Sequence, residues 1–80
     1  MKLLNLTISR VDAPVFDGDV VSVTVPGTEG EMTILADHTA LISVLKAGVI
    51  TVMTESGTKE TFETTTGTLE ISNNHATVLI

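Results

Sequence analysis

The sequence of 80 residues predicts an all-β fold, a small two-sheet β-sandwich of about eight to ten short strands, with residues 1–80 forming one domain. Three observations predict it. Valine, isoleucine and threonine make up 30 of the 80 residues, and these β-branched types suit a pleated sheet better than a helix. Two segments alternate between apolar and polar residues, and turn residues recur at short spacing between the apolar runs.

The chain divides into eight expected strands, over residues 2–9, 15–25, 31–35, 41–45, 49–54, 59–64, 68–71 and 75–80. The second strand is expected to bend near residues 17–19. Beyond the bend Val21, Val23 and Val25 share one parity, so we expect this segment to have an inward face. In the last strand Ala76, Val78 and Ile80 alternate with Thr77 and Leu79 in the same way.

Turn chemistry separates the other strands. Pro26-Gly27 precedes the third, Ala47-Gly48 the fifth, and residues 55–58 separate the fifth from the sixth. Asn73-Asn74 suits a two-residue hairpin with both residues at positive φ. Residues 41–45 fit a helical face as well as a strand, but the segment is too short for the pattern to decide.

Composition excludes several classes of function. Four basic residues face ten acidic ones, a formal net charge of −6, which repels the polyphosphate backbone of nucleic acids. Tryptophan and tyrosine are absent, and with them the stacking platforms of most carbohydrate and single-strand binders. Without cysteine there is neither a disulfide framework nor a thiolate nucleophile. The apolar runs are too short to span a bilayer, so we expect a cytosolic protein without direct membrane insertion.

The most informative segment is the glycine-framed turn after the second strand. Gly27 and Gly30 are expected to take positive φ in a tight reversal, from which Glu29 and Glu31 project as an acidic tip. Simple solvation of the two acids and contact with a protein partner are both open readings. Next to this tip we expect at least two of three apolar residues to be buried: Met32, Ile34 and Leu35.

Other candidate sites are weaker. Asp37-His38 could be a general base with its orienting acid, as in a small hydrolase, but no supported nucleophile accompanies the pair. The alternative is that His38 caps a turn while Asp37 accepts backbone N–H bonds. We expect no metal site, because His38 and His75 lie in dissimilar surroundings, and no nucleotide or other cofactor, because the glycine turn is acidic.

A long series of residues carries a family resemblance: Val15-Phe16-Asp17-Gly18-Asp19-Val20, Val23-Thr24-Val25, Pro26 to Leu35, His38, Leu41, Leu45, Gly48-Val49-Ile50, Phe62, Thr66-Gly67-Thr68-Leu69-Glu70-Ile71 and Asn74 to Leu79. In this series the chain resembles the N-terminal β-sandwich of the epsilon subunits of rotary F-type ATP synthases, the counterpart of the mitochondrial delta subunit. The match covers nearly all 80 residues.

The resemblance implies a non-catalytic subunit of the central stalk that couples ion transport to ATP synthesis. Its implied partners are the gamma subunit and the membrane rotor ring of c subunits, at the cytoplasmic face of the bacterial inner membrane. Glu29, Gly30 and Glu31 match the ring-facing loop of the family. His38 and Thr39 match the gamma and ring junction, and Arg10 matches part of the gamma-facing region. The rival reading is a stand-alone ligand-binding β-sandwich.

The chain departs from the family pattern at Asp37, at Ala40 and at residues 66–68. The family commonly continues into a C-terminal helical hairpin that restrains ATP hydrolysis, whereas these 80 residues stop at the last expected strand. We therefore expect no restraint of that kind from the residues printed here.

Overall fold

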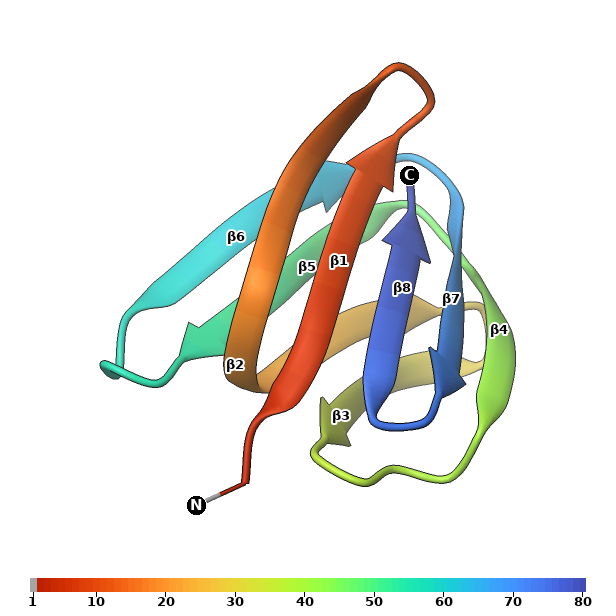
Figure 1. The fold of residues 1–80 in the computed structure, drawn as a ribbon. Helices are drawn as coiled ribbons and strands as arrows, with labels where there is room; N and C mark the ends of the chain where they lie inside the picture. The colour runs from red at the N-terminus through yellow and green to blue at the C-terminus, as the bar shows by residue number, and fades with distance from the viewer. Residues whose placement is uncertain (1) are drawn as a thin grey trace.

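A computed structural model describes residues 2–80, which form eight strands and no helix (Figure 1). Each predicted strand is present, and its ends lie within two residues of the predicted ones. The segment 41–45 is a strand. The strands are β1 (Leu4–Arg10), β2 (Ala13–Gly27), β3 (Gly30–Leu35), β4 (Leu41–Leu45), β5 (Gly48–Thr54), β6 (Lys59–Thr64), β7 (Gly67–Ser72) and β8 (His75–Leu79).

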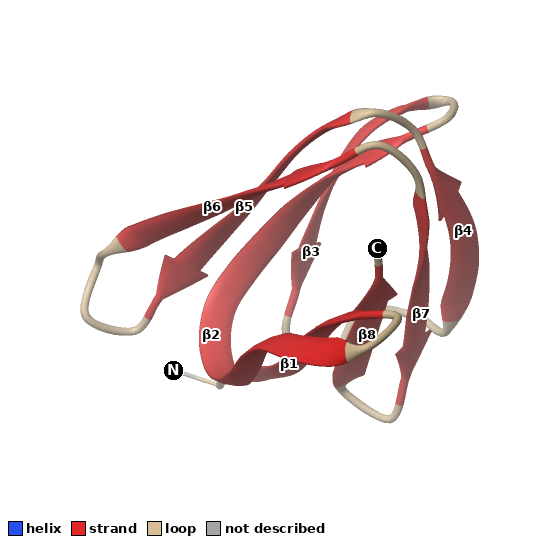
Figure 2. Ribbon diagram, turned by 90° about the horizontal axis from the view of Figure 1, so that it is seen from above, coloured by secondary structure: helices blue, strands red, loops and turns tan. Residues whose placement is uncertain are grey.

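The strands form two layers that share β2, so the predicted two-sheet sandwich is confirmed (Figure 2). In one layer the order is β2-β1-β8-β7-β4, with β1 and β8 parallel. In the other layer β2 lies between β3 and β5, and β6 pairs with the far side of β5. The layers meet again where Gly27 pairs with Leu45.

The strand β2 changes layers at an irregularity between Val20 and Ser22. The bend was predicted near residues 17–19, which pair regularly with β1, and the irregularity follows them directly, from Val20. Because the irregularity inserts one residue, Val20 and Val23 both face the core, and Val21 is only half-buried. The predicted inward parity therefore holds for Val23 and Val25 alone.

The core is aliphatic and fills the space between the layers. Alternate residues of β1 and β8 point inward, among them Leu6, Ala76 and Val78, while Ile80 packs against the core from the chain end. Phe16 and Phe62 meet edge to face at its border, with ring centroids 6.2 Å apart. The buried hydrophobic residues that form the core are Leu4, Leu6, Ile8, Val20, Val23, Val25, Ile34, Leu45, Ile50, Val52, Leu69, Ile71, Ala76 and Val78.

In β3 the alternation is stricter than we predicted. Ile34 is buried and Met32 is half-buried against the core, whereas Leu35 is 55% exposed. The expectation that at least two of the three would be buried is wrong, because side chains of a strand alternate and Leu35 shares its face with Thr33.

The turn between β7 and β8 confirms its predicted geometry. Asn73 and Asn74 have φ of 51° and 59°, the left-handed conformation that asparagine tolerates better than most residues.

In the connection between β6 and β7, the hydroxyl of Thr64 donates to the carbonyl oxygen of Thr66 at 2.6 Å, which satisfies a buried polar side chain.

Gly67 provides a test of the packing between β7 and the chain end. A Cβ at Gly67 would overlap the carbonyl oxygen of Leu79, whereas a Cβ at Gly18 would make only an ordinary contact, 3.8 Å from Phe16. We expect Gly67→Ala to lower the free energy of unfolding by about 1–3 kcal/mol, because backbone must move. Gly18→Ala should change it by less than about 1 kcal/mol. Urea unfolding measures both, and equal effects would contradict this packing.

Candidate functional site: the β2–β3 hairpin and the β3–β4 loop

The acidic tip is a tight hairpin between β2 and β3. Gly30 has φ of 135°, a conformation that side chains rarely adopt, which confirms the need for glycine there. Glu29 and Glu31 are exposed, as predicted. Within residues 2–80 the ion pair joins Lys2 and Asp37 and does not involve these two glutamates. Both carboxylates are therefore free to meet a partner.

Gly27 is a glycine for a different reason from the one predicted. It is not among the residues at positive φ but belongs to the extended end of β2. A Cβ there would lie 2.7 Å from the carbonyl oxygen of Gly30. Close approach of two strands, rather than a turn conformation, therefore excludes a side chain at this position.

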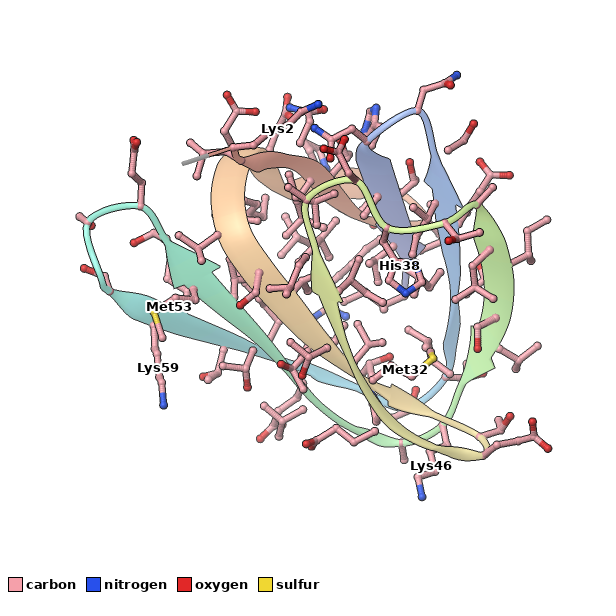
Figure 3. All side chains as sticks on the ribbon, turned by 90° about the horizontal axis from the view of Figure 1, so that it is seen from below. Lys2, Met32, His38, Lys46, Met53 and Lys59 are labelled. Atoms are coloured by element: carbon pink, nitrogen blue, oxygen red, sulfur yellow. The ribbon has the colours of Figure 1, made fainter. Side chains whose placement is uncertain are left out.

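Backbone hydrogen bonds fix the hairpin against β4. The N–H of Thr28 donates to the carbonyl oxygen of Val44 at 3.1 Å, and the N–H of Lys46 donates to that of Pro26 at 2.8 Å. Between hairpin and β4 lies an open hollow of about 310 Å³, lined in part by Met32, Leu41 and Ile42. Figure 3 shows Met32 pointing into the space between β3 and β4. The acidic tip thus stands on a fixed base.

The loop 36–40 joins β3 to β4 and carries the predicted Asp37-His38 pair. Asp37 has φ of 61° and its carboxylate pairs with the Lys2 ammonium at 2.9 Å, both side chains being more than half exposed. Its N–H donates to the Asn74 side-chain oxygen at 2.7 Å. The expectation that the Asp37 carboxylate accepts backbone N–H bonds is therefore wrong in residues 2–80; its recorded partner is Lys2.

The imidazole of His38 bonds to the backbone of its own loop, just after the turn at residues 36–37. Its Nδ1 donates to the carbonyl oxygen of Thr39 at 2.8 Å, and both residues are exposed. Asp37 and His38 therefore engage different partners, Lys2 and Thr39, rather than each other. Asp37 is therefore not the orienting acid of His38 that the general-base reading requires.

Arg10, which the resemblance matches to part of the gamma-facing region, does not lie with His38 and Thr39. Arg10 ends β1, where its guanidinium donates to the carbonyl oxygen of Glu63 at 3.5 Å. The loop 36–40 instead contacts Lys2 and Asn74, beside the start of β1. The two regions are separated by the length of β1, about 20 Å for seven residues of extended chain.

The hairpin tip and the loop 36–40 lie at opposite ends of β3, about 17 Å apart along an extended strand of six residues. They form two separate sites along one side of the sandwich. The two histidine rings have different partners: Nε2 of His75 lies 3.1 Å from the Thr7 hydroxyl, whereas His38 bonds to Thr39. Residues 2–80 contain no group of three metal-ligating side chains, and no helix in this range could cross a membrane.

An apolar surface, whose residues the sequence reasoning did not name, lies on the outer face of the β1-containing layer. Ile42 and Val44 of β4 are 74% and 56% exposed, and Leu79 of β8 is 53% exposed. Val44 and Leu79 flank Thr68 in one cross-strand row. The alternation of side chains along β4 could have predicted this surface. In a strand with Leu41 and Leu45 inward, the residues Ile42 and Val44 must point outward.

Two kinds of sequence comparison, with a family model and with individual proteins, match almost the whole chain to the same family. A sequence model of the family described as "ATP synthase, Delta/Epsilon chain, beta-sandwich domain" matches residues 3–80. The chain is 42% identical over 80 residues to the ATP synthase epsilon chain of a Nitratiruptor species, covering 100% of this chain and 62% of that protein. It is 39% identical over 77 residues to that of Protochlamydia amoebophila, covering 96% and 52%. The chain thus spans less than two-thirds of either relative.

Solved structures show the same fold. A chain in the cryo-EM structure of Euglena gracilis mitochondrial ATP synthase, OSCP/F1/c-ring in rotational state 1, superposes with a TM-score of 0.91 at 25% identity, covering 96% of this chain and 49% of that one. A chain from the central stalk and c-ring of Tetrahymena thermophila mitochondrial ATP synthase gives 0.81 at 18% identity, covering 94% and 60%. The second likeness concerns the fold alone.

The hydrogen bond from His38 predicts its tautomer. A carbonyl oxygen can only accept, so the neutral ring must carry its proton on Nδ1, leaving Nε2 as an acceptor. We expect ¹⁵N NMR of the neutral imidazole to show a protonated Nδ1. His75 is the internal control, because the Thr7 hydroxyl can donate or accept and fixes neither tautomer. A proton on Nε2 of neutral His38 would contradict the turn geometry.

Proposed function

Because the chain belongs to the ATP synthase delta/epsilon-chain β-sandwich family, we propose that it is a non-catalytic central-stalk subunit that binds the gamma subunit and the rotor ring of c subunits. The observation that carries the proposal is the family match over residues 3–80. The Euglena neighbour was solved together with its c-ring, which supports a ring partner for this chain. In this role the protein acts at the cytoplasmic face of the bacterial inner membrane, peripherally and as part of the complex.

The acidic tip is suited to the ring. Glu29 and Glu31 are exposed on a hairpin whose base is hydrogen-bonded to β4, so the charges keep a fixed position relative to the body. Charged groups at an interface set register and orientation more than they add affinity. We therefore assign to Glu29, Gly30 and Glu31 the contact with basic or amide side chains on the ring loops.

The exposed apolar surface suits the gamma subunit. Ile42, Val44 and Leu79 lie on a sheet face that is otherwise rich in threonine and serine, and burial of such a surface favours stable association. His38 and Thr39 lie in the neighbouring loop 36–40, which ends where β4 begins. We assign these two residues to the gamma and ring junction, and Arg10 to a separate gamma contact at the far end of β1.

A stiff body is what a rotor part requires. The sandwich has an aliphatic core with no buried side-chain nitrogen or oxygen lacking a hydrogen bond in residues 2–80. Close-packed interiors have low compressibility and transmit strain. Torque applied at the apolar face is thereby carried to the acidic tip with little deformation between them.

Association with gamma is the first test. The chain mixed with the purified gamma subunit of the same organism should co-elute in gel filtration as a one-to-one complex, because the exposed apolar surface is then buried. Val44→Lys should weaken this complex by tenfold or more in Kd, since it places a charge in the apolar surface. Thr61→Lys is the control, as Thr61 is exposed on β6, in the other layer and outside the residues assigned to gamma. Lack of any association between folded partners would contradict the proposal.

Charge reversal at the tip is the second test. Glu29→Lys with Glu31→Lys should weaken attachment to the rotor ring and lower proton- or sodium-driven ATP synthesis in reconstituted vesicles, because the tip then repels basic groups. The isolated domain should stay folded, since both side chains are solvent-exposed.

Glu55→Lys with Glu60→Lys gives the same change in net charge at exposed positions of the β5–β6 hairpin, and this hairpin lies on the opposite side of the body (Figure 1). The control should couple normally. If the tip variant also couples normally, the assignment of Glu29 and Glu31 is wrong. If both pairs impair coupling alike, the effect is one of net charge and not of the tip.

A further inference from the structure

Three segments that are far apart in the sequence meet at the turn between β7 and β8. They are residues 2–5 at the start of the chain, the loop 36–40 and the turn residues 73–74. The residue common to all three is Asn74, which is half-buried while its neighbour Asn73 is exposed. The sequence pattern explained Asn74 only as a turn former, which leaves its side chain unaccounted for.

Both ends of the Asn74 amide are used. Its Oδ1 accepts the N–H of Asp37 at 2.7 Å, and its Nδ2 donates to the carbonyl oxygen of Leu3 at 2.9 Å. Its own carbonyl oxygen accepts the N–H of Asn5 at 3.2 Å. One residue thus joins the loop 36–40 to the start of β1, beside its neighbour β8.

The contact to Asp37 matters because Asp37 holds a conformation that is unfavourable for most residues. Its φ of 61° is in the left-handed region, where a residue with a Cβ needs local support. The other recorded contact of Asp37 is the ion pair with Lys2, whose side chains are 63% and 59% exposed. Exposed ion pairs contribute little, so the hydrogen bond that the Asp37 N–H donates to Asn74 is the stronger constraint on the loop.

We propose that Asn74 is a positioning residue that holds the loop 36–40 in the conformation in which His38 and Thr39 meet the partner. The inference rests on the proposed function for its partner, the gamma subunit, but the holding of the loop is a property of the isolated chain. Only asparagine combines an acceptor, a donor and tolerance of positive φ at this length of side chain.

The test compares Asn74→Gly with Asn73→Gly. Both glycines keep the positive φ of the turn, but only the first removes a hydrogen-bonded side chain, since Asn73 has no recorded side-chain hydrogen bond in residues 2–80. We expect Asn74→Gly to raise the amide hydrogen-exchange rates of residues 36–40 about tenfold relative to Asn73→Gly, after correction for global stability. The Kd for the purified gamma subunit should rise by a similar factor.

Asn74→Asp separates the two arms of the amide. A carboxylate keeps the acceptor for the Asp37 N–H and loses the donor to Leu3. We expect this variant to retain the slow exchange of residues 36–40 and the wild-type Kd, although its free energy of unfolding falls. Such a rescue distinguishes positioning from a general loss of stability.

The possible outcomes are separable. If Asn74→Gly lowers global stability but leaves exchange in the loop 36–40 equal to that of Asn73→Gly, Asn74 does not hold the loop and the proposal is wrong. If the loop loosens and binding to gamma is unchanged, the loop is held but not for this partner, which also overturns it. If the wild-type chain does not bind gamma at all, the proposed function fails, and the exchange rates alone still decide whether Asn74 holds the loop.

Discussion

The structure depends on one strand that is hydrogen-bonded in both layers. β2 pairs with β1 along its first half and with β3 and β5 along its second, so the two sheets cannot be assembled independently. The insertion of one residue between Val20 and Ser22 turns the strand from one layer to the other. Because this turn keeps Val20, Val23 and Val25 inside, the same strand contributes to the core on both sides of the bend.

The positions of the candidate contact residues follow from this arrangement. Since β2 leaves the first layer at Val20, its end reaches β4 at Gly27, where the backbone bonds of Thr28 and Lys46 fix the hairpin. β3 then returns antiparallel to β2, which carries the chain away from the tip and to the loop 36–40. The acidic tip and His38 are therefore held at opposite ends of one strand by backbone pairing, independently of the side chains they present.

Local patterns predicted the fold well, and contacts between distant segments account for what they missed. The turn conformation of Asn73-Asn74, that of Gly30 and the exposure of the two glutamates depend on their own backbone or on solvent, so the sequence suffices to place them. The role of Gly27, by contrast, arises from the approach of Gly30 across the hairpin, and the separation of Arg10 from His38 arises from the course of β1. The outward position of Leu35 could have been predicted from the alternation of side chains along β3. The prediction counted apolar residues and did not ask which face each of them occupies.

In the proposed role the two surfaces have different physical tasks. The apolar residues Ile42, Val44 and Leu79 supply area whose burial is favourable whatever the angle of rotation, so they suit the partner to which the domain stays attached. The tip charges act over a Debye length of about 8 Å at physiological salt and are sensitive to position. They suit a ring of repeated, similar contacts in which register is to be selected. The acidic tip sets the position of the domain on the ring, and the apolar surface passes that position on to gamma. This works only if the sandwich between the two surfaces does not deform.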